Sequence, residues 1–444
     1  MPLRDFLRVP TNLLVLDVGG TFLKLARVEL PSLTILRFVR EEMPPPRIDT
    51  DGRVSYRISE LRPLMDRAKI ALRDLSDDQS VAVAITGQMH GVALCGWDEP
   101  DGEVICWRDS LTCRTSGIEA RASDQVSEII GDETRVRLGN ELREGLPIAT
   151  LTARMTRGEL RSGRFRSILA LFAEGLTGQW CGSVHPTDAA ASGLADVANA
   201  TWARDVIELL GFGGIELPDI AAGPTTIGTL DGLPVTAPIG DHQAALLGSQ
   251  LPSGAVSLNM ATGGQVSTIS DSEPGKWQVR PYFSGRYIRT ITHIPSGRAM
   301  NALLALLFEG ERQSVSAGWA WITANTRNLL EVPSGSVNAS PGFFPSVAGE
   351  CGALTNLSEG NMTRANVIAS CASSIVDLFY EYSHLISGGN ALNDVIVTGG
   401  LGTRSELFRS LLRQRFDGQT LRFVDEEDAA VLGAARFTWN YTQN

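Results

Sequence analysis

The sequence has few cysteines, and those it has form no recognisable binding pattern. Its six cysteines are scattered over 444 residues, with no Cys-x-x-Cys pair and no histidine at ligand spacing. A disulfide framework needs paired, regularly spaced cysteines, and a structural zinc site needs a compact Cys/His set. We therefore expect reduced thiols and no zinc site.

Long apolar runs and excess positive charge are missing as well. No stretch of about 18 uninterrupted apolar residues occurs, and the first eleven residues contain no apolar segment of the signal-peptide type. The formal charge of −11 disfavours a nucleic-acid backbone as the main partner. We expect a cytoplasmic protein that binds neither membrane nor nucleic acid.

What is present is the composition of an ordinary globular protein, with 43% hydrophobic and 20% charged residues. Disordered and fibrous classes are excluded. At this length we expect two or three domains, each able to close its own core. Helical spacing predicts helices over 58–75 and 403–415, and the middle of the chain, 119–210, is mostly helical in pattern.

A strand, glycine turn, strand pattern occurs twice. The first apolar strand ends at Asp17, before Gly19 and Gly20, and the second is the strand 255–260, which precedes the turn 261–264. The repeat suggests two related α/β domains that meet near Gln250 and each offer a phosphate-sized turn to a shared cleft. Two unrelated hairpins are the alternative.

The glycine turns suit phosphate, because small residues let backbone N–H groups approach the oxygens. In the first turn the Thr21 hydroxyl adds a donor, and Asp17 could hold a hydrated Mg²⁺. Near the C-terminus, an apolar strand from Asp394 ends in Gly399-Gly400 before a helix, a junction that would admit an adenosine. An ordinary hairpin turn and a tight α/β turn are the alternatives.

Three loops at strand ends carry polar side chains suited to a polyhydroxylated ligand. They are Gln88-Met89-His90-Gly91, Trp107-Arg108-Asp109 and Gly240-Asp241-His242-Gln243. Each has a structural alternative: a buried hydrogen-bonded histidine for His90, a core position for Trp107, and a helix N-cap for Asp241.

The order of these motifs, together with Thr187-Asp188, closely resembles the FGGY family of carbohydrate kinases over nearly the whole chain. The resemblance implies an α/β fold of two actin-like (ribonuclease H-like) ATPase domains around a central cleft. Residues 1–250 would form the N-terminal domain, mainly sugar-binding, and residues 251–444 the C-terminal domain, mainly ATP-binding.

The resemblance also implies roles for individual residues. Asp241 would be the general base of phosphoryl transfer from ATP, and Asp17 would organise Mg²⁺. The nucleotide would be bound by Gly19, Gly20 and Thr21 at the γ-phosphate, Thr262, Gly263 and Gly264 at the β- and γ-phosphates, and Gly399, Gly400 and Ser405 at the adenosine. The sugar would be bound by Gln88, Met89, His90, Trp107, Arg108, Asp109, Asp188, Asp241 and His242.

Details within the family favour a ketose as the small-molecule substrate. The residues Gln88, Met89 and His90 match xylulose-type kinases, and the sequence around Asp241 is closer to sedoheptulose kinases. Two departures stand out: Arg108 replaces the more usual asparagine, and Ala261 replaces a glycine in the second phosphate turn.

Three other functions remain open from the sequence. They are an ATP-binding switch or chaperone of the same superfamily, a catalytically weak sugar sensor, and a kinase for a polyol such as glycerol. The switch does not explain Asp241 beside Gln88 and His90, and a sensor would usually have lost Asp17 or Asp241. The sequence leaves both a monomer and a homodimer open.

Overall fold

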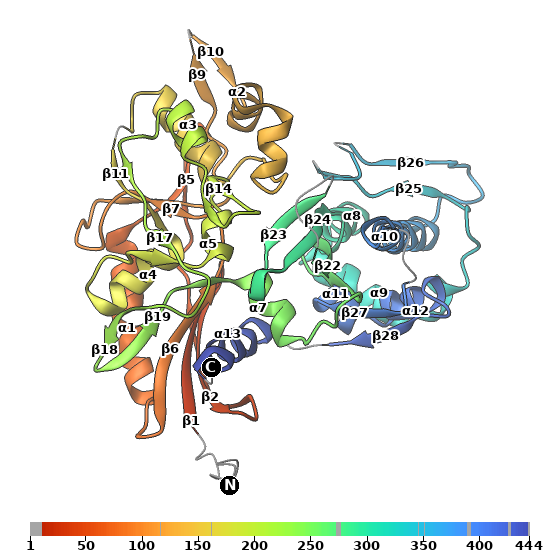
Figure 1. Cartoon of the computed structure of the whole chain (residues 1–444). Helices are drawn as coiled ribbons and strands as arrows, with labels where there is room; N and C mark the ends of the chain where they lie inside the picture. The colour runs from red at the N-terminus through yellow and green to blue at the C-terminus, as the bar shows by residue number, and fades with distance from the viewer. Residues whose placement is uncertain are drawn as a thin grey trace. The chain divides into compact units, whose positions relative to one another are not determined.

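The computed structural model describes residues 11–115, 117–160, 162–271, 277–344, 346–349, 351–388, 392–424 and 428–442. The chain divides into two compact units, both of mixed α/β structure (Figure 1). Unit 1 comprises Met1–Gln250, Asp271–Tyr287 and Asp428–Asn444, and unit 2 comprises Leu251–Ser270 and Ile288–Glu427. The predicted α/β class is confirmed.

The main sheet of unit 1 has the strand order β18-β19-β6-β1-β2-β3, and β20 also pairs with β6. Strands β1, β2 and β3 are antiparallel, whereas β6 runs parallel to β1, β19 and β20. The strands are β1 (Thr11–Val18), β2 (Phe22–Leu30), β3 (Thr34–Glu42), β6 (Ser80–Gly87), β18 (Thr226–Leu230), β19 (Leu233–Thr236) and β20 (Ile239–Gly240).

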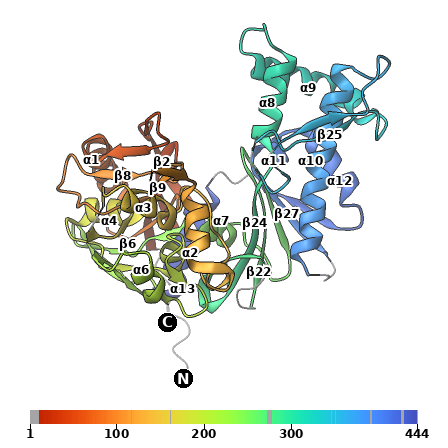
Figure 2. The same ribbon diagram turned by 90° about the horizontal axis from the view of Figure 1, so that it is seen from above.

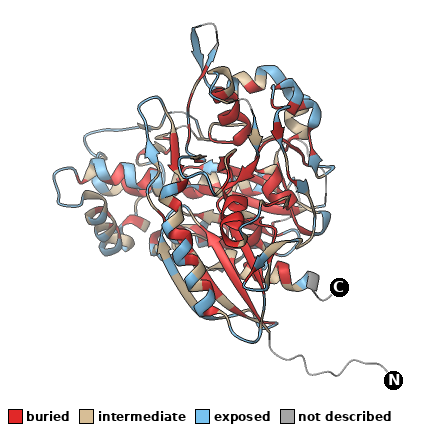
Figure 3. Cartoon of the chain, turned by 90° about the vertical axis from the view of Figure 1, so that its left-hand side faces the viewer, coloured by how far each residue is buried: buried red, intermediate tan, exposed pale blue. Residues whose placement is uncertain are grey.

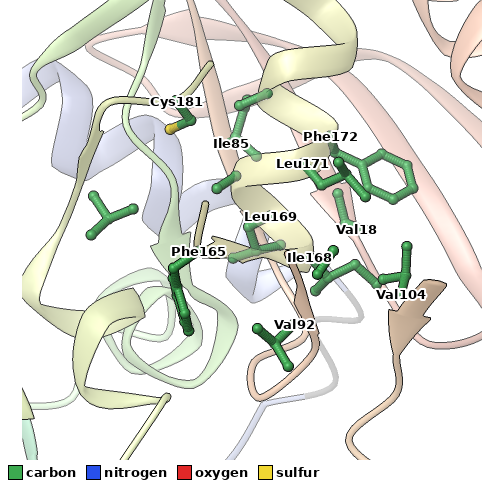
Figure 4. Close-up of a cluster of buried hydrophobic side chains, with 14 of the residues drawn as sticks. Val18, Ile85, Val92, Val104, Phe165, Ile168, Leu169, Leu171, Phe172 and Cys181 are labelled. Atoms are coloured by element: carbon green, nitrogen blue, oxygen red, sulfur yellow. The ribbon is translucent and has the colours of Figure 1, made fainter. Parts of the chain in front are cut away.

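Strand β1 forms because its run of apolar residues is buried on both faces of this sheet. Leu14, Leu16 and Val18 belong to a core that includes side chains of α1 (Ile58–Leu75) and α4 (Ile168–Thr177). Figure 4 shows part of this core, with Val18 and Phe172 among the labelled side chains. The alternate residues of β1 point to the opposite face, where α13 (Ala429–Thr442) contacts β1 and β6.

A smaller sheet completes the core of unit 1, in the order β12-β7-β8-β5-β4. Buried residues gather in the interior of the unit and exposed ones on the outer helix faces and loops (Figure 3). The strands are β4 (Arg47–Ile48), β5 (Val54–Arg57), β7 (Val92–Ala93), β8 (Glu103–Ile105) and β12 (Arg166–Ser167). Short strand pairs also occur: β9 (Cys113–Thr115) with β10 (Ile118–Ala120), β11 (Gly163–Arg164) with β16 (Ile215–Glu216), β13 (Ser183–Val184) with β17 (Asp219–Ile220), and β14 (Ala195–Asp196) with β15 (Thr201–Trp202).

The remaining elements of unit 1 follow the predicted order. Helix α1 has the bounds that the helical spacing predicts, and it begins with the Glu60 carboxylate accepting the Arg57 backbone N–H. The middle of the chain is helical, as predicted, but short strands interrupt it. The other elements are α2 (Ala122–Arg137), α3 (Pro147–Thr156), α5 (Pro186–Ala190), α6 (Arg204–Leu209), α7 (Asp241–Gly248) and β23 (Gln278–Pro281).

Unit 2 is built on the strand order β24-β22-β21-β27-β28. Its longest helix, α10, packs against β22, and Figure 2 shows it running alongside the sheet. The strands are β21 (Val256–Met260), β22 (Gly264–Ser270), β24 (Tyr287–Ile294), β25 (Asn338–Ser340), β26 (Ala353–Thr355), β27 (Asp394–Thr398) and β28 (Thr420–Phe423). The helices are α8 (Gly297–Leu307), α9 (Ser314–Leu330), α10 (Arg364–Ile386), α11 (Gly400–Arg404) and α12 (Glu406–Arg415).

Both predicted strand, glycine turn, strand patterns are hairpins in the structure, β1–β2 and β21–β22. The helix predicted over 403–415 is broken at Ser405, which is extended between α11 and α12. Among the described residues, no helix is long and apolar enough to cross a membrane.

Helices α7 and α13 pack in very close contact at two glycines. A Cβ atom at Gly433 would lie 1.8 Å from the carbonyl oxygen of Ala244, and one at Gly248 would lie 1.9 Å from that of Ala429. Neither glycine has a positive φ angle, so close packing, rather than backbone conformation, requires them. Because glycine has no side chain, the backbones of α7 and α13 can approach each other closely at these two positions.

We expect Gly433→Ala to destabilise unit 1, because the added methyl group would overlap the backbone of α7. Overpacking of this kind costs about 1 to 3 kcal/mol, which corresponds to a fall in Tm of roughly 3 to 10 °C in thermal unfolding. Gly182→Ala is the matched control, since its Cβ would meet only the Trp180 ring, at 3.9 Å. Equal Tm values for the two variants would contradict the packing argument.

Candidate functional site

Parallel strand pairing brings three polar segments of unit 1 to one edge of its main sheet. Asp17 of β1 is paired with Thr86 of β6, and Thr86 is also paired with Ile239 of β20. Because these strands are parallel, the residues that end or follow them share an edge. Asp17, Gln88 and Asp241 are therefore neighbours, although they are far apart in the sequence.

The segment after β6 is held tightly against β1. Gly87 has a φ of +150°, and a Cβ there would lie 2.4 Å from the carbonyl oxygen of Val18, so only glycine fits. The backbone N–H of Gln88 donates to Val18 at 2.8 Å, and its side-chain Nε2 lies 3.5 Å from the carbonyl oxygen of Gly19. This links the predicted sugar loop to the first glycine turn, in which Gly20 and Thr21 are exposed.

Asp17 is a buried carboxylate, with 5% of its surface exposed. Burial raises its pKa to about 7, the Lys24 ammonium opposes that shift, and the charges of Asp241 and Asp428 add to it. Lys24 lies 3.7 Å from Asp17 and 3.4 Å from Asp428. Three carboxylates therefore share one region of unit 1, where additional positive charge would be stabilising.

Asp241 is the first residue of α7, and the N-cap residue is Gly240. The Oδ1 atom of Asp241 accepts a hydrogen bond from the backbone N–H of His242 at 2.7 Å. Burial raises the pKa of Asp241 to about 6, although the backbone bond and the charges of Arg280 and Lys24 lower it. A half-buried carboxylate with this pKa can accept a proton near neutral pH.

The two predicted histidines lie beside a buried ion pair. His90 has a φ of +71°, and its Nδ1 is 2.7 Å from the carbonyl oxygen of Ala191. Its Nε2 is 3.8 Å from the carboxylate of Glu141. Burial, the leading cause in each case, lowers the pKa of both His90 and His242 to about 3, so both rings are neutral at physiological pH.

Sequence reasoning missed the ion pair itself. Arg280 of β23 donates two hydrogen bonds to Glu141, from Nη2 at 2.8 Å and from Nε at 3.1 Å, and its Nη1 lies 3.1 Å from Nδ1 of His242. Arg143 lies 3.5 Å from the same carboxylate. Burial raises the pKa of Glu141, but the Arg280 guanidinium and the other nearby charges outweigh it and hold that pKa well below its usual range. No sequence motif marks these residues, because β23 returns to unit 1 from beyond residue 250.

Other predicted sugar-binding residues lie in different surroundings. Asp109 is fully buried, and both of its carboxylate oxygens accept hydrogen bonds from Arg154, at 3.0 and 3.1 Å. Trp107 is 40% exposed, which excludes the core position considered above, and Arg108 is also exposed. Within the described part of the chain, no hydrogen bond or ion pair joins these three residues to Asp17 or Asp241.

Asp188 lies on α5, next to Thr187, which contacts the start of α7. Burial raises its pKa to about 7, and its carboxylate accepts a hydrogen bond from the Ser167 hydroxyl at 2.6 Å. The adjacent Thr187 hydroxyl accepts the backbone N–H of Gly240 at 3.1 Å. In addition, a Cβ at Gly240 would lie 2.5 Å from the sulfur of Met89, so Met89 packs directly beneath the start of α7.

In unit 2 the predicted nucleotide-binding turns share one sheet edge. Strands β21 and β27 are parallel, with Asn259 paired to Thr398, so the turn 262–264 and Gly399 both follow this edge. Gly399 has a φ of +81°, and a Cβ there would lie 2.5 Å from the backbone of Met260. Thr262 and Gly263 are exposed, and Gly400 has open space beside it. Ser405 is the N-cap residue of α12.

The chain is similar in sequence to curated glycerol kinases, and no family model matches it. It is 30% identical to glycerol kinase 2 from Streptomyces avermitilis over 206 residues, which are 40% of this chain and 37% of that one. It is 31% identical to the glycerol kinase of Rhizorhabdus wittichii, over 41% of this chain and 38% of that one. The matches thus span less than half of these relatives.

The fold is shared with solved kinases over nearly the whole chain. Gluconate kinase from Lactobacillus acidophilus has a TM-score of 0.81 at 17% identity, and xylulose kinase from Rhodospirillum rubrum has 0.80 at 19%. Both matches cover 98% of this chain and 90% of the other. A Plasmodium falciparum glycerol kinase with ADP has a TM-score of 0.75, with 98% and 90% covered. These comparisons confirm the resemblance to carbohydrate kinases and show that the chain shares the fold of the solved ones.

The raised pKa of Asp17 predicts a pH-dependent cost to stability. Its pKa is about 7 in the folded chain and 3.8 when exposed, so the folded chain keeps a proton that the unfolded chain has released. The contribution of Asp17 to the free energy of unfolding therefore falls as the pH rises from about 4 to 7. We expect Asp17→Asn to raise the Tm at pH 8, and by less at pH 5.

Thermal unfolding of the variant and the original chain at both pH values checks this prediction. Asp219→Asn is the control, because Asp219 is exposed. An equal gain in Tm at pH 5 and pH 8 would show that the charge of Asp17 is not responsible.

Proposed function

We propose that this chain, a relative of the FGGY carbohydrate kinases in both sequence and fold, transfers the γ-phosphate of ATP to a hydroxyl of a small polyhydroxylated substrate. The observation that carries this proposal is the meeting of Asp241 and Asp17 at one sheet edge, beside the glycine turn 19–21. Phosphoryl transfer needs positioning, charge stabilisation and a group that accepts the hydroxyl proton. This edge of unit 1 offers residues for each.

Asp241 would act as the general base. Its pKa of about 6 leaves it largely ionised at neutral pH, yet basic enough to accept a proton as the substrate hydroxyl attacks. The backbone N–H of His242 fixes one of its oxygens, and packing of Met89 under Gly240 fixes the start of its helix.

Asp17 would hold Mg²⁺ through water. A hydrated cation fits the single buried carboxylate of Asp17, because its raised pKa shows that the site lacks enough positive charge to offset burial. Among the described residues no group of three His, Cys, Asp or Glu side chains could hold a metal ion directly, so contact through water is the mode that fits. When bound with ATP, the ion would neutralise charge on the phosphates. Lys24 would remain close to both Asp17 and Asp428.

The glycine turns would bind the nucleotide. Gly19, Gly20 and Thr21 would face the γ-phosphate, Thr262, Gly263 and Gly264 the β- and γ-phosphates, and Gly399, Gly400 and Ser405 the adenosine. In support, Gly263 and Gly400 have open space where a side chain would stand, so a ligand can approach the backbone. Ala261 leaves the turn 262–264 anchored, since its carbonyl accepts the Gly297 N–H at 3.0 Å.

The acceptor would be a ketose or glycerol. The loop 88–90 supports sedoheptulose or D-xylulose, whereas the curated sequence relatives are glycerol kinases. Gln88, His90 and His242 provide the amide and imidazole groups that hydrogen-bond to hydroxyls, and such groups suit either substrate. Trp107 and Arg108, which are exposed, would bind more distant parts of the substrate. Asp109 would hold their loop in place through Arg154, and Asp188 would hold the start of α5, where Thr187 contacts Gly240.

We expect one acceptor to release ADP from Mg-ATP in a panel of D-xylulose, D-ribulose, L-ribulose, sedoheptulose, L-rhamnulose, gluconate and glycerol. Asp241→Asn should lower kcat on the order of 10² to 10⁴-fold with a smaller change in KM, because a base acts in the transition state. Asp219→Asn is the matched control.

Two outcomes would contradict the proposal in different ways. Unchanged kcat in Asp241→Asn would remove Asp241 from the role of base. ATP binding without ADP release for every acceptor would favour a sugar sensor or an ATP-dependent switch of the same fold.

A further inference from the structure

We infer that Arg280, paired with Glu141, is a positioning residue for the acceptor substrate, because it fixes the imidazole of His242 as a hydrogen-bond donor beside Asp241. The inference rests on the proposed function for its kinetic consequence. The geometry itself belongs wholly to unit 1.

Hydrogen bonds to Glu141 hold the guanidinium of Arg280 in place beside His242. Arg280 is 7% exposed, and its two hydrogen bonds to Glu141 use Nε and Nη2 in the fork geometry that holds a guanidinium in one plane. The remaining Nη1 lies 3.1 Å from Nδ1 of His242. Glu141 thus orients Arg280, and Arg280 orients His242.

This contact determines the tautomer of His242. A guanidinium has only donors, so Nδ1 must accept the hydrogen bond and carries no proton. The ring is neutral, since burial and the nearby Arg280 lower its pKa to about 3. The single ring proton therefore lies on Nε2, which becomes a donor to an oxygen atom.

His90 provides an internal contrast in the same region. Its Nδ1 lies 2.7 Å from the carbonyl oxygen of Ala191, and a carbonyl oxygen can only accept. The proton of His90 therefore lies on Nδ1, the opposite of His242. The two neighbouring histidines are held in different tautomers by their partners.

Loss of Arg280 would change the titration of His242. The charged and titratable groups around this ring come from four segments: Arg280 from β23, Glu141 and Arg143 from the segment after α2, His90 from the loop after β6, and Asp241 from α7. Without Arg280, Glu141 would remain as a negative charge that favours the imidazolium. His242 would then bind a proton at a higher pH, and its Nδ1 would no longer be kept as an acceptor.

The kinetic test compares Arg280→Met and Arg280→Lys with Arg73→Met, a surface arginine paired with Asp231. With the acceptor found in the panel, Arg280→Met should raise the acceptor KM roughly 2- to 10-fold, the range for losing a hydrogen bond between two neutral groups, here the His242 imidazole and a substrate hydroxyl. The KM for ATP should change little, and the acid limb of kcat/KM should move to higher pH. Arg280→Lys should recover part of the loss, and Arg73→Met should behave as the original chain.

The tautomers can be measured without any activity. Long-range ¹H–¹⁵N spectra of the histidine-labelled chain, assigned with His242→Gln and His90→Gln, should show Nε2–H for His242 and Nδ1–H for His90. The double variant Glu141→Gln with Arg280→Met should lose the His242 preference and keep that of His90, while avoiding an unpaired buried carboxylate.

A proton on Nδ1 of His242 in the original chain would overturn the inference. So would an Arg280→Met enzyme with unchanged acceptor KM and pH profile. Absence of phosphoryl transfer in the original chain would instead contradict the proposed function, and the spectra would still decide the inference about Arg280.

Discussion

The parallel pairing of β1, β6 and β20 is the constraint on which the candidate site depends. A parallel register places the carboxyl ends of all three strands at one edge, and each strand there delivers a polar residue: Asp17, Gln88 and Asp241. Gly87 makes this pairing tight enough for Gln88 to reach the first glycine turn. The chemistry therefore follows from backbone hydrogen bonds made by buried, otherwise apolar strands.

The position of Asp241 also depends on the far end of the chain. Helix α13 returns to unit 1 and packs on α7 through two glycines that leave no room for side chains. The same helix contacts β1 and β6, so it touches the sheet and the helix that carry the carboxylates. Asp428, just before α13, adds its charge to the environment of Asp17. A C-terminal segment thus shapes both the packing and the electrostatics of an N-terminal site.

Sequence patterns predicted those helices and strands in which apolar residues recur at a regular spacing or form a continuous run. Helix 58–75, the two glycine hairpins and the strand before Gly399 are all present, because each has an apolar face or run that its own neighbours bury. The strands β18 and β19 were not predicted, since their Gly- and Pro-rich segment is extended only by pairing with each other and with β6. Glu141 and Arg280 carry no local signal either, because their pairing joins segments separated by 139 positions.

Balance of charge explains why those unpredicted residues matter to the site. Asp17 and Asp241 are carboxylates in an apolar setting, and burial raises the pKa of both. Lys24 lowers the pKa of both residues, and Arg280 lowers that of Asp241. Asp241 keeps a pKa of about 6 because burial raises it by more than the His242 backbone N–H, Arg280 and Lys24 lower it. An unpaired arginine in this position would hold Asp241 more strongly ionised and make it a weaker base, whereas no arginine would favour its protonated form. Burial and Arg280 therefore shift the basicity of Asp241 in opposite directions, and Arg280, held by Glu141, also orients the neighbouring imidazole.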